Sequence, residues 1–196
     1  FTQPAMDAVA ESGAGDITGQ SAGICGKLAA MTKPKRSKTN STQDSNGAVL
    51  VLHGPNLNLL GTREPEIYGR TTLASIHKAM EARARAFGVR LESFQSNHEG
   101  DLIDWLHAYR SGADAIVMNP GGLTHTSVAL RDAVAALPVP LAEVHLSDVR
   151  RREVFRRVSL LRDVRFIEVS GYGLVSYRMA ILRLMEYLGP PAEYKI

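Results

Sequence analysis

The sequence predicts an α/β domain in which a doubly wound sheet of five parallel strands lies between two layers of helices. From residue 48 onward, apolar runs of strand length alternate with longer segments whose apolar residues recur every three to four positions. The first run, Val49 to Leu52, has no polar residue, which is typical of a parallel strand that helices cover on both faces. Glycine or proline follows several of these runs, as expected where strands and helices end.

In the first half of this region, strands are expected at residues 48–53 and 89–95, and helices at about 72–87 and 99–110. Thr71 or Thr72 can cap the first helix, and Gly88 ends it. Gly112 ends the second helix. Each helix carries one apolar stripe, formed by Leu73, Ile76, Met80, Ala84 and Phe87 in the first and by Leu102, Ile103, Trp105, Leu106 and Tyr109 in the second.

In the second half, strands are expected at residues 114–118, 140–145 and 164–169. Helices are expected at about 126–136, in a charged segment near 151–158, and from the residues after Gly173 to about Leu188. Strands that alternate with helices are joined by right-handed crossovers and form a parallel sheet. A doubly wound sheet with five strands favours the flavodoxin-like strand order 2-1-3-4-5.

Three segments of different character are expected along the 196 residues. Residues 1–47 are rich in Gly, Ser, Thr, Ala and Asn, have no sustained period, and are interpreted as a disordered extension. Residues 48–190 are expected to form the catalytic flavodoxin-like domain, and residues 191–196 a short tail.

Composition narrows the classes of partner and compartment. The net charge is only +3, and the basic run Lys33, Lys35, Arg36 and Lys38 is interpreted as a solvated tail, so no nucleic-acid partner is expected. No apolar run approaches the roughly 20 residues of a membrane span, and no secretory signal is recognised. The single cysteine, Cys25, fits a reducing compartment. These features predict a cytoplasmic protein without a membrane partner.

Polar residues gather where the expected strands end. The first strand ends in the stretch from His53 to Asn56, the second in the stretch from Gln95 to His98 and the third at Asn119. The fourth ends in the stretch that holds Glu143, His145 and Ser147. The carboxyl ends of parallel strands meet at one edge of the sheet, where such folds bind ligands. A segment of about fifteen residues after the first strand adds Arg63 and Tyr68 between Gly61 and Gly69, and loops of this length are often lids.

The available residues restrict the chemistry. The sequence contains neither a dinucleotide-binding glycine motif nor a Walker A loop, the histidines lack metal-ligand spacing, and neither Ser127 nor Ser147 lies in a nucleophile-elbow motif. No cofactor or metal is therefore expected. Proton transfer by tyrosine and histidine remains, with arginine and asparagine to stabilise charge. Taken singly, Tyr68 is equally consistent with packing, and His125 with capping a helix; the assembled set favours an active site.

Five motifs in order resemble those of type II 3-dehydroquinate dehydratases, and the resemblance extends over about Val49 to Leu188. The first is the stretch from His53 to Gly69, HGPNLNLLGTREPEIYG. The others are QSNHEG at residues 95–100, NPGGLTHTSVALRD at 119–132, EVHLS at 143–147 and REVFR at 152–156. The resemblance implies a flavodoxin-like enzyme that converts 3-dehydroquinate to 3-dehydroshikimate in the shikimate route to chorismate, without a cofactor, by anti elimination through an enolate.

The resemblance also implies a role for each matching residue. Tyr68 is implied as the base, Arg63 as the lid cation, Asn56 as the residue that holds the enolate oxygen through water, and His145 as the acid that protonates the leaving hydroxyl. The implied substrate-binding residues are Asn119, His125 and Arg156, with the backbone amides of Leu146 and Ser147 for the carboxylate. Glu143 is implied to orient the histidine, Arg152 is a candidate second cation near Tyr68, and Asp132 is implied to reach a neighbouring subunit's site in a dodecamer of trimers.

Two other functions stay open on the sequence alone: a flavodoxin-like protein that binds a phosphorylated ligand without catalysis, and a catalytically inactive oligomeric scaffold. One departure from the motifs bears on the site. Asp148 directly follows the segment implied to bind the substrate carboxylate, and so places a negative charge near an anionic substrate.

Overall fold

The computed structural model describes residues 47–62 and 70–189, and within them it shows the expected parallel sheet. The strand order is β2-β1-β3-β4-β5, which confirms the flavodoxin-like prediction. The strands are β1 Ala48–His53, β2 Arg90–Gln95, β3 Ala115–Asn119, β4 Leu141–His145 and β5 Ile167–Ser170.

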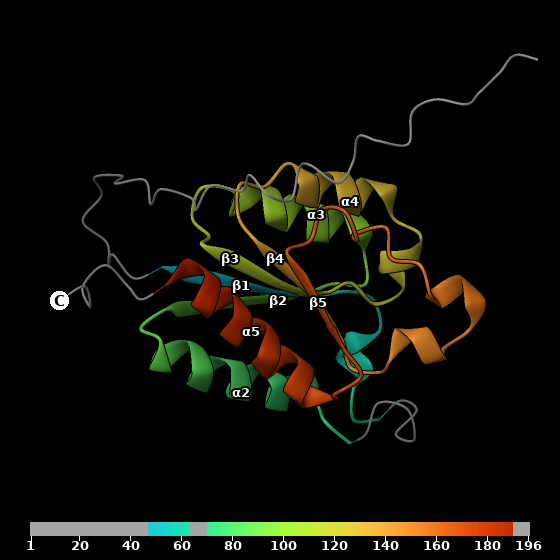
Figure 1. Ribbon diagram of the computed structural model, residues 1–196, viewed down its shortest axis with the longest axis horizontal. Helices are drawn as coiled ribbons and strands as arrows, with labels where there is room; N and C mark the ends of the chain where they lie inside the picture. Colours follow the sequence, from blue (N-terminus) through green and yellow to red (C-terminus); the bar gives the residue numbers. More distant parts are fainter. Residues whose placement is uncertain (1–46, 63–69, 190–196) are drawn as a thin grey trace, which may run out of the picture. The chain divides into compact units, whose positions relative to one another are not determined.

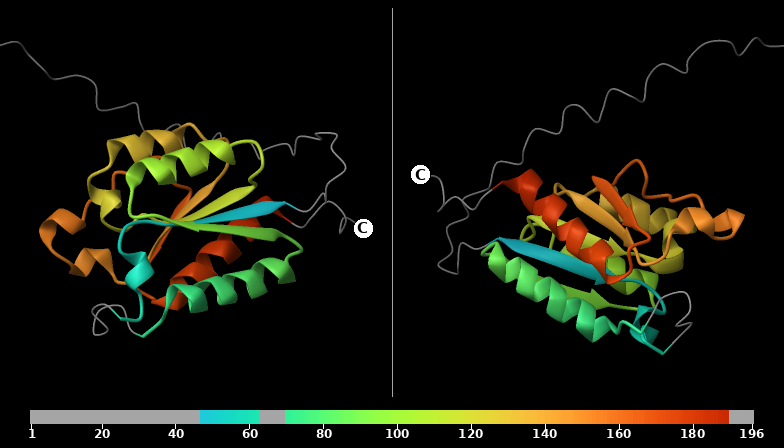
Figure 2. Two further views of the ribbon diagram at one scale, coloured as in Figure 1. Left: turned by 180° about the vertical axis from the view of Figure 1, so that it is seen from behind. Right: turned by 60° about the horizontal axis from the view of Figure 1, so that its bottom comes forward.

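Among the described residues, the helices α2, α3, α4 and α5 cover the two faces of this sheet (Figures 1 and 2). Helices α2 (Leu73–Ala86) and α5 (Leu174–Leu188) pack on one face, and α3 (Glu99–Ala108) and α4 (Val128–Ala135) pack on the other. Alternate residues of β1 serve the two hydrophobic cores, because successive side chains of a strand point to opposite faces. Val49 and Val51 belong to the core under α2 and α5, and Leu50 and Leu52 to the core under α3 and α4.

Helix α2 illustrates how local sequence sets an element. The Thr72 side chain accepts a hydrogen bond from the Ser75 amide at 3.2 Å, which is the predicted cap. The middle of the predicted stripe is buried, with Ile76 and Met80 fully enclosed, while Leu73 and Phe87 at its ends are partly buried. Gly88 has a φ of +66°, a left-handed conformation that ends the helix at little cost for a residue without a Cβ.

The prediction of a helix near residues 151–158 was wrong. Two 3₁₀ turns occupy this segment, η4 (Val149–Arg151) and η5 (Val154–Arg156), and Arg152 between them is extended with φ −93° and ψ −175°. Only one acidic residue, Glu153, accompanies the five arginines of residues 150–157, and in a helix Arg152 and Arg156 would form a like-charge i,i+4 pair. The extended backbone instead lets the Arg152 guanidinium donate to Ser147 Oγ at 3.3 Å.

Three other boundaries differ from the prediction by two residues or more. Strand β5 begins at Ile167 because a turn precedes it, in which the Arg165 amide donates to the Leu161 carbonyl at 2.9 Å. Helix α4 begins at Val128, two residues late, because the 3₁₀ turn η3 (Gly121–His125) comes first. Helix α3 ends at Ala108, two residues early.

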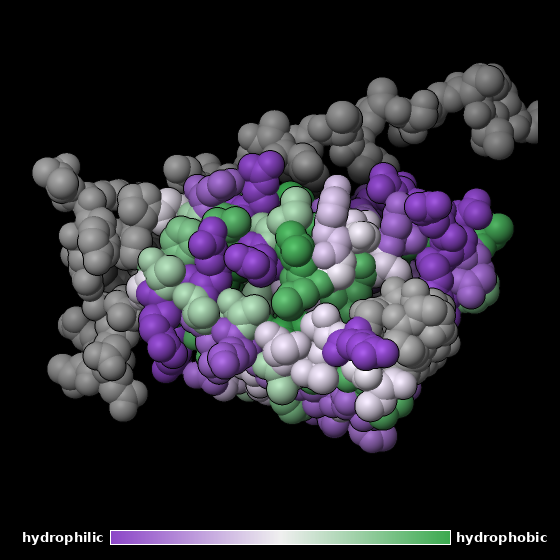
Figure 3. Space-filling model, turned by 90° about the horizontal axis from the view of Figure 1, so that it is seen from below, coloured by the Kyte–Doolittle hydropathy of each residue, from purple (hydrophilic) through white to green (hydrophobic). Residues whose placement is uncertain are grey.

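The predicted N-terminal extension, apart from Gly47, and the predicted C-terminal tail lie outside the described residues. In the described ranges, no helix combines the length and the apolar character that crossing a membrane requires. Seen from the side of α2 and α5, hydrophilic side chains gather at the end of the molecule that carries η4 and η5 (Figure 3).

The turns that follow β1 and β3 cross at close range, and this crossing predicts an intolerant position. The Gly54 amide donates to the Asn119 carbonyl at 2.8 Å, and a Cβ added to Gly54 would overlap the Pro120 backbone carbonyl. We expect Gly54→Ala to destabilise the fold by about 1–3 kcal/mol, the usual cost of overpacking, in urea unfolding. Gly100→Ala is the matched control, because a Cβ there meets no atom within 4 Å. Equal stability of the two variants would contradict the close crossing.

Candidate active site

The predicted polar residues at the strand ends do share one edge of the sheet. In the parallel pairing of β1 with β3, His53 lies opposite Asn119, so both strands end at the same level. Asn119 is buried, and its Oδ1 accepts a hydrogen bond from the Gly121 amide at 3.2 Å. This bond assigns the amide oxygen to the turn and leaves the nitrogen to donate elsewhere.

Asn56 lies next to this turn, in a left-handed conformation with φ 67°. Asparagine tolerates that conformation better than most residues. Its backbone amide donates to Asn97 Oδ1 at 2.8 Å, which connects the loop after β1 to the loop after β2. Arg63 and Tyr68, the predicted lid arginine and base, lie outside the described residues.

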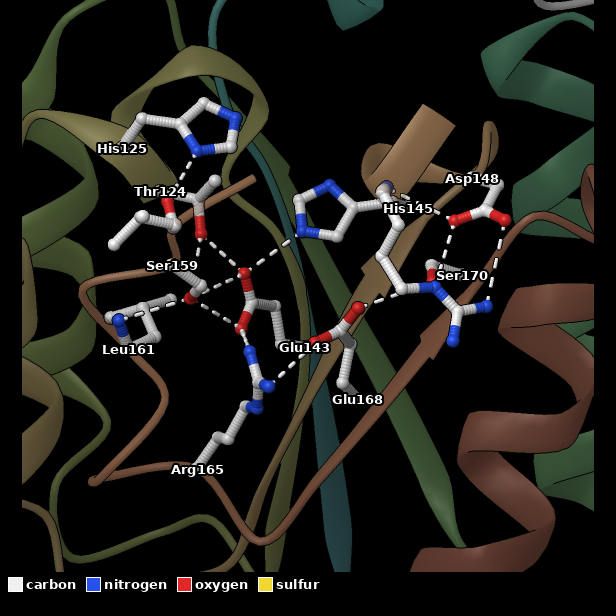
Figure 4. Close-up of polar contacts among 12 residues, drawn as sticks. Thr124, His125, Glu143, His145, Asp148, Ser159, Leu161, Arg165, Glu168 and Ser170 are labelled. Atoms are coloured by element: carbon white, nitrogen blue, oxygen red, sulfur yellow. Dashed lines mark hydrogen bonds and ion pairs between the residues drawn. The ribbon is translucent and has the colours of Figure 1, made fainter. Parts of the chain in front are cut away.

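His145 and Glu143 form the centre of the candidate site, at the carboxyl end of β4 (Figure 4). Both side chains are nearly inaccessible, with exposures of 6% and 0%. His145 Nε2 and Glu143 Oε1 are 2.8 Å apart. The two residues are two positions apart in the strand, so their side chains lie on the same face.

The charge of Glu143 determines which nitrogen of His145 carries the proton. Burial alone would raise the pKa of Glu143, but hydrogen bonds from His145 and Thr124 and the nearby Arg165 outweigh it and lower that pKa to about 2. The ionised carboxylate can only accept hydrogen bonds, so Nε2 of His145 must carry a proton. Nδ1 is therefore the nitrogen that remains for chemistry.

Three further partners of Glu143 were not predicted. Thr124 Oγ1 and the Arg165 guanidinium both contact its carboxylate, and Ser159 Oγ lies 2.9 Å and 3.0 Å from its two oxygens. Thr124 directly precedes the predicted His125 within the motif at residues 119–132, so the sequence could have indicated Thr124 as a site residue. Ser159 and Arg165 follow Glu143 by 16 and 22 residues, and no motif or spacing marked them.

A pocket of about 80 Å³ opens beside His145 and brings three of the predicted residues together. Two histidines, five arginines and one glutamate account for most of its lining, so its charge is strongly positive. The lining residues are His125, His145, Val149, Arg150, Arg156, Arg157, Ser159, Arg162, Arg165 and Glu168. Such a cavity suits a small anion.

Two of the predicted binding residues in this pocket are fixed by local contacts. His125 Nδ1 lies 2.6 Å from the Val158 carbonyl, so it carries a proton and leaves Nε2 free. The residue that caps α4 is Ser127, not His125. Arg156 pairs with Glu153 at 3.2 Å and lies over the Phe155 ring.

The remaining predicted residues are placed around this centre. Leu146 is buried and Ser147 half-buried directly after His145. Asp148 is engaged by its own turn, because Arg150 Nε lies 3.1 Å from its Oδ1 and lowers the pKa of this carboxyl. Asp132 does not join the site within this chain: it lies on α4, pairs with Arg131 at 2.9 Å, and has a side chain that is 64% exposed.

Three hydrogen-bonded rings, those of Tyr177, His53 and His77, lie between the end of β1 and the helices α2 and α5. His53 Nδ1 lies 2.9 Å from the Tyr177 hydroxyl, and His53 Nε2 lies 2.9 Å from His77 Nε2. The side-chain amide of Asn119 also forms a hydrogen bond with the Tyr177 hydroxyl. Burial first, and then His77, lower the pKa of His53 to about 3, so this histidine is neutral in the folded protein.

Comparison with known proteins identifies close relatives. Residues 47–185 match the sequence profile of the family described as Dehydroquinase class II. A "3-dehydroquinate dehydratase" of Ralstonia pickettii (strain 12J) is 58% identical over 134 residues, which cover 68% of this chain and 86% of that protein. The protein of the same name from Rhodopseudomonas palustris (strain BisA53) is 49% identical over 146 residues, 74% of this chain and 97% of that protein.

Solved structures give the same result. The type II dehydroquinase of Butyrivibrio crossotus DSM 2876 superposes with a TM-score of 0.70 at 40% identity, covering 72% of this chain and 99% of that one. The type II dehydroquinase of Propionibacterium acnes gives 0.68 at 34% identity, covering 71% and 98%.

The buried neutral His53 predicts a loss of stability in acid. Its pKa is about 3 in the folded chain, against an ordinary value of 6.5 for an exposed histidine. Between these two pH values, His53 is therefore protonated in the unfolded chain and neutral in the folded chain. The free energy of unfolding should therefore fall by up to about 1.4 kcal/mol per pH unit from this residue. In urea unfolding at pH 6.5 and 4.5, His53→Asn should show a smaller fall than the wild type; an unchanged fall would assign the effect to other groups.

Proposed function

The chain belongs to the class II dehydroquinase family, and from this premise we propose that it is a hydro-lyase that dehydrates 3-dehydroquinate to 3-dehydroshikimate. The reaction needs no cofactor in this proposal and proceeds by anti elimination through an enolate. Its place is the shikimate route to chorismate and the aromatic amino acids.

The observation that carries the proposal is the arrangement of His145 beside the pocket. Its Nε2 proton is bound to the ionised, buried Glu143, and the ring lines a cavity with five arginines. A histidine that a carboxylate holds in one tautomer beside an anion site is suited to transfer a proton to a leaving hydroxyl. The substrate is a carboxylate anion, which the positive pocket favours.

The other roles follow the motif positions. Asn119, His125 and Arg156 bind the substrate hydroxyls, and the backbone amides of Leu146 and Ser147 bind its carboxylate. His125 supports this assignment with a free Nε2 at the pocket wall. Asn56 holds the enolate oxygen through water, from its place beside the turn of Asn119.

Proton removal is assigned to Tyr68, with Arg63 as the cation of the lid. A free tyrosine has a pKa of about 10 and is a poor base at neutral pH, so nearby cations must favour its phenolate. Arg152 is the second candidate cation, and its guanidinium is held near the end of β4 by Ser147 Oγ at 3.3 Å.

We also propose that the active form is an oligomer, a dodecamer built from trimers, in which Asp132 completes the site of a neighbouring subunit. Asp132 and Val128 are four residues apart on α4, so they share one helix face, and Val128 is 60% exposed. An apolar residue and a carboxylate on one open face are consistent with a subunit contact.

The enzymatic prediction is that the purified chain forms a conjugated enone from 3-dehydroquinate, measured by ultraviolet absorbance.

Tyr68→Phe should lower kcat by orders of magnitude with little change in substrate binding, because the ring stays and the base is lost. Arg63→Ala should also lower kcat. If the two residues act as a unit, the double variant should be little worse than Tyr68→Phe, since catalytic partners are strongly non-additive. Near-normal turnover by Tyr68→Phe would exclude this residue as the base.

The mechanism class has its own test, because an enolate path leaves no covalent adduct. Between residues 47 and 189 the chain has one lysine, Lys78, and it is exposed on α2. Treatment with borohydride in the presence of substrate should therefore leave the enzyme active and unmodified by mass spectrometry. A stable adduct of protein and substrate would contradict the enolate mechanism.

A further inference from the structure

We propose that Arg165 is a positioning residue for His145, acting through Glu143: it holds one carboxylate oxygen so that the other stays on His145 Nε2. The inference rests on the proposed function only in taking His145 as the acid of the reaction. None of the five motifs contains Arg165.

The contacts divide the Glu143 carboxylate into two halves (Figure 4). Oε1 accepts from His145 Nε2 at 2.8 Å and from Thr124 Oγ1, and Oε2 contacts Arg165 Nη1. Ser159 Oγ lies within 3.0 Å of both oxygens. A carboxylate offers about four acceptor sites, and these four donors use them. The carboxylate therefore cannot rotate without breaking several bonds.

Arg165 is itself held in place from two directions. Its backbone amide donates to the Leu161 carbonyl at 2.9 Å, and the next amide, of Phe166, donates to the Leu141 carbonyl at 2.8 Å at the start of β4. Its Nη2 pairs with Glu168 on β5, and its side chain is only 13% exposed. The guanidinium thus spans two carboxylates from a fixed backbone, a geometry that its planar fork allows and an ammonium cannot copy in full.

The charge of Arg165 matters as much as its shape. Glu143 is fully buried, and a buried carboxylate without a cation is strongly unfavourable. With Arg165 present, the charge on Oε2 is balanced, and Oε1 acts mainly as the acceptor that selects the Nε2–H tautomer of His145. Without Arg165, we expect the carboxylate to reorient or to take up a proton. After either change, Glu143 would no longer keep the proton of His145 on Nε2.

The experiment compares Arg165→Met with Arg165→Lys and Arg165→Gln. The first removes charge and donors, the second keeps the charge, and the third keeps a donor without charge. The control is Arg162→Met, which removes an arginine that lines the same pocket but is not among the groups that contact the Glu143 carboxylate. The measured quantities are kcat and KM for 3-dehydroquinate, and the ¹⁵N imidazole shifts of histidine-labelled protein, in which His145→Gln assigns the His145 signals.

Arg165→Met should lower kcat by about tenfold to a hundredfold, the range found when a partner that orients a functional histidine is lost, with KM little changed. Arg165→Lys should recover part of the kcat, and Arg165→Gln should recover less. The Nε2–H signature of His145 should weaken in Arg165→Met, whereas Arg162→Met should leave it unchanged. A wild-type kcat together with a wild-type imidazole signature in Arg165→Met would overturn the proposal.

Loss of folding is separated from loss of positioning by the Glu143→Gln background, which has no buried carboxylate charge to compensate. There, adding Arg165→Met should cause no further fall in kcat, because the positioning path is already broken. A further fall of the same size as in the wild-type background would overturn the proposal. The imidazole signature is read without substrate, so it tests Arg165 even if the chain does not turn over 3-dehydroquinate.

Discussion

The structure of the candidate site depends on one buried carboxylate. Glu143 lies on β4 between β3 and β5 with no exposed surface, yet it is ionised. Burying a charge is costly unless hydrogen bonds and a counter-charge satisfy it. Thr124, Ser159, His145 and Arg165 provide both, and they come from different parts of the chain. The requirement to satisfy this one group therefore orders η3, the segment before β5, and the histidine of the site together.

A second constraint is the close approach of the turns after β1 and β3. The Gly54 amide bonds the Asn119 carbonyl, and only a residue without a Cβ leaves room for the Pro120 carbonyl. This contact sets the turns of Asn56 and Asn119 side by side at the edge where parallel strands present their carboxyl ends. Below them, His53 and Tyr177 fill the space with neutral hydrogen-bonded rings, so the edge is supported without another buried charge.

The arginines of the segment between β4 and β5 show how charge shapes local structure and site together. A segment with five arginines and one glutamate in eight residues does not form the predicted helix, and two 3₁₀ turns separated by an extended residue take its place. Arg150 and Arg156 pair locally with Asp148 and Glu153. Even so, arginine dominates the pocket wall, which gives an anionic substrate a favourable potential before any single contact forms.

The sequence alone determined the sheet order, the first strand, the capped helix α2 and the placement of His145, Glu143 and Asn119 at one edge. These features depend on local period, on turn residues and on the rule that parallel strands end together, all of which are readable along the chain. Only the tertiary structure decided the protonated nitrogen of His145 and the involvement of Ser159, Arg165 and Tyr177. Ser159 and Arg165 lie 16 and 22 residues from Glu143, and Tyr177 lies 124 residues from His53. Such pairings depend on how elements pack and which buried groups need partners, and no spacing in the sequence records either.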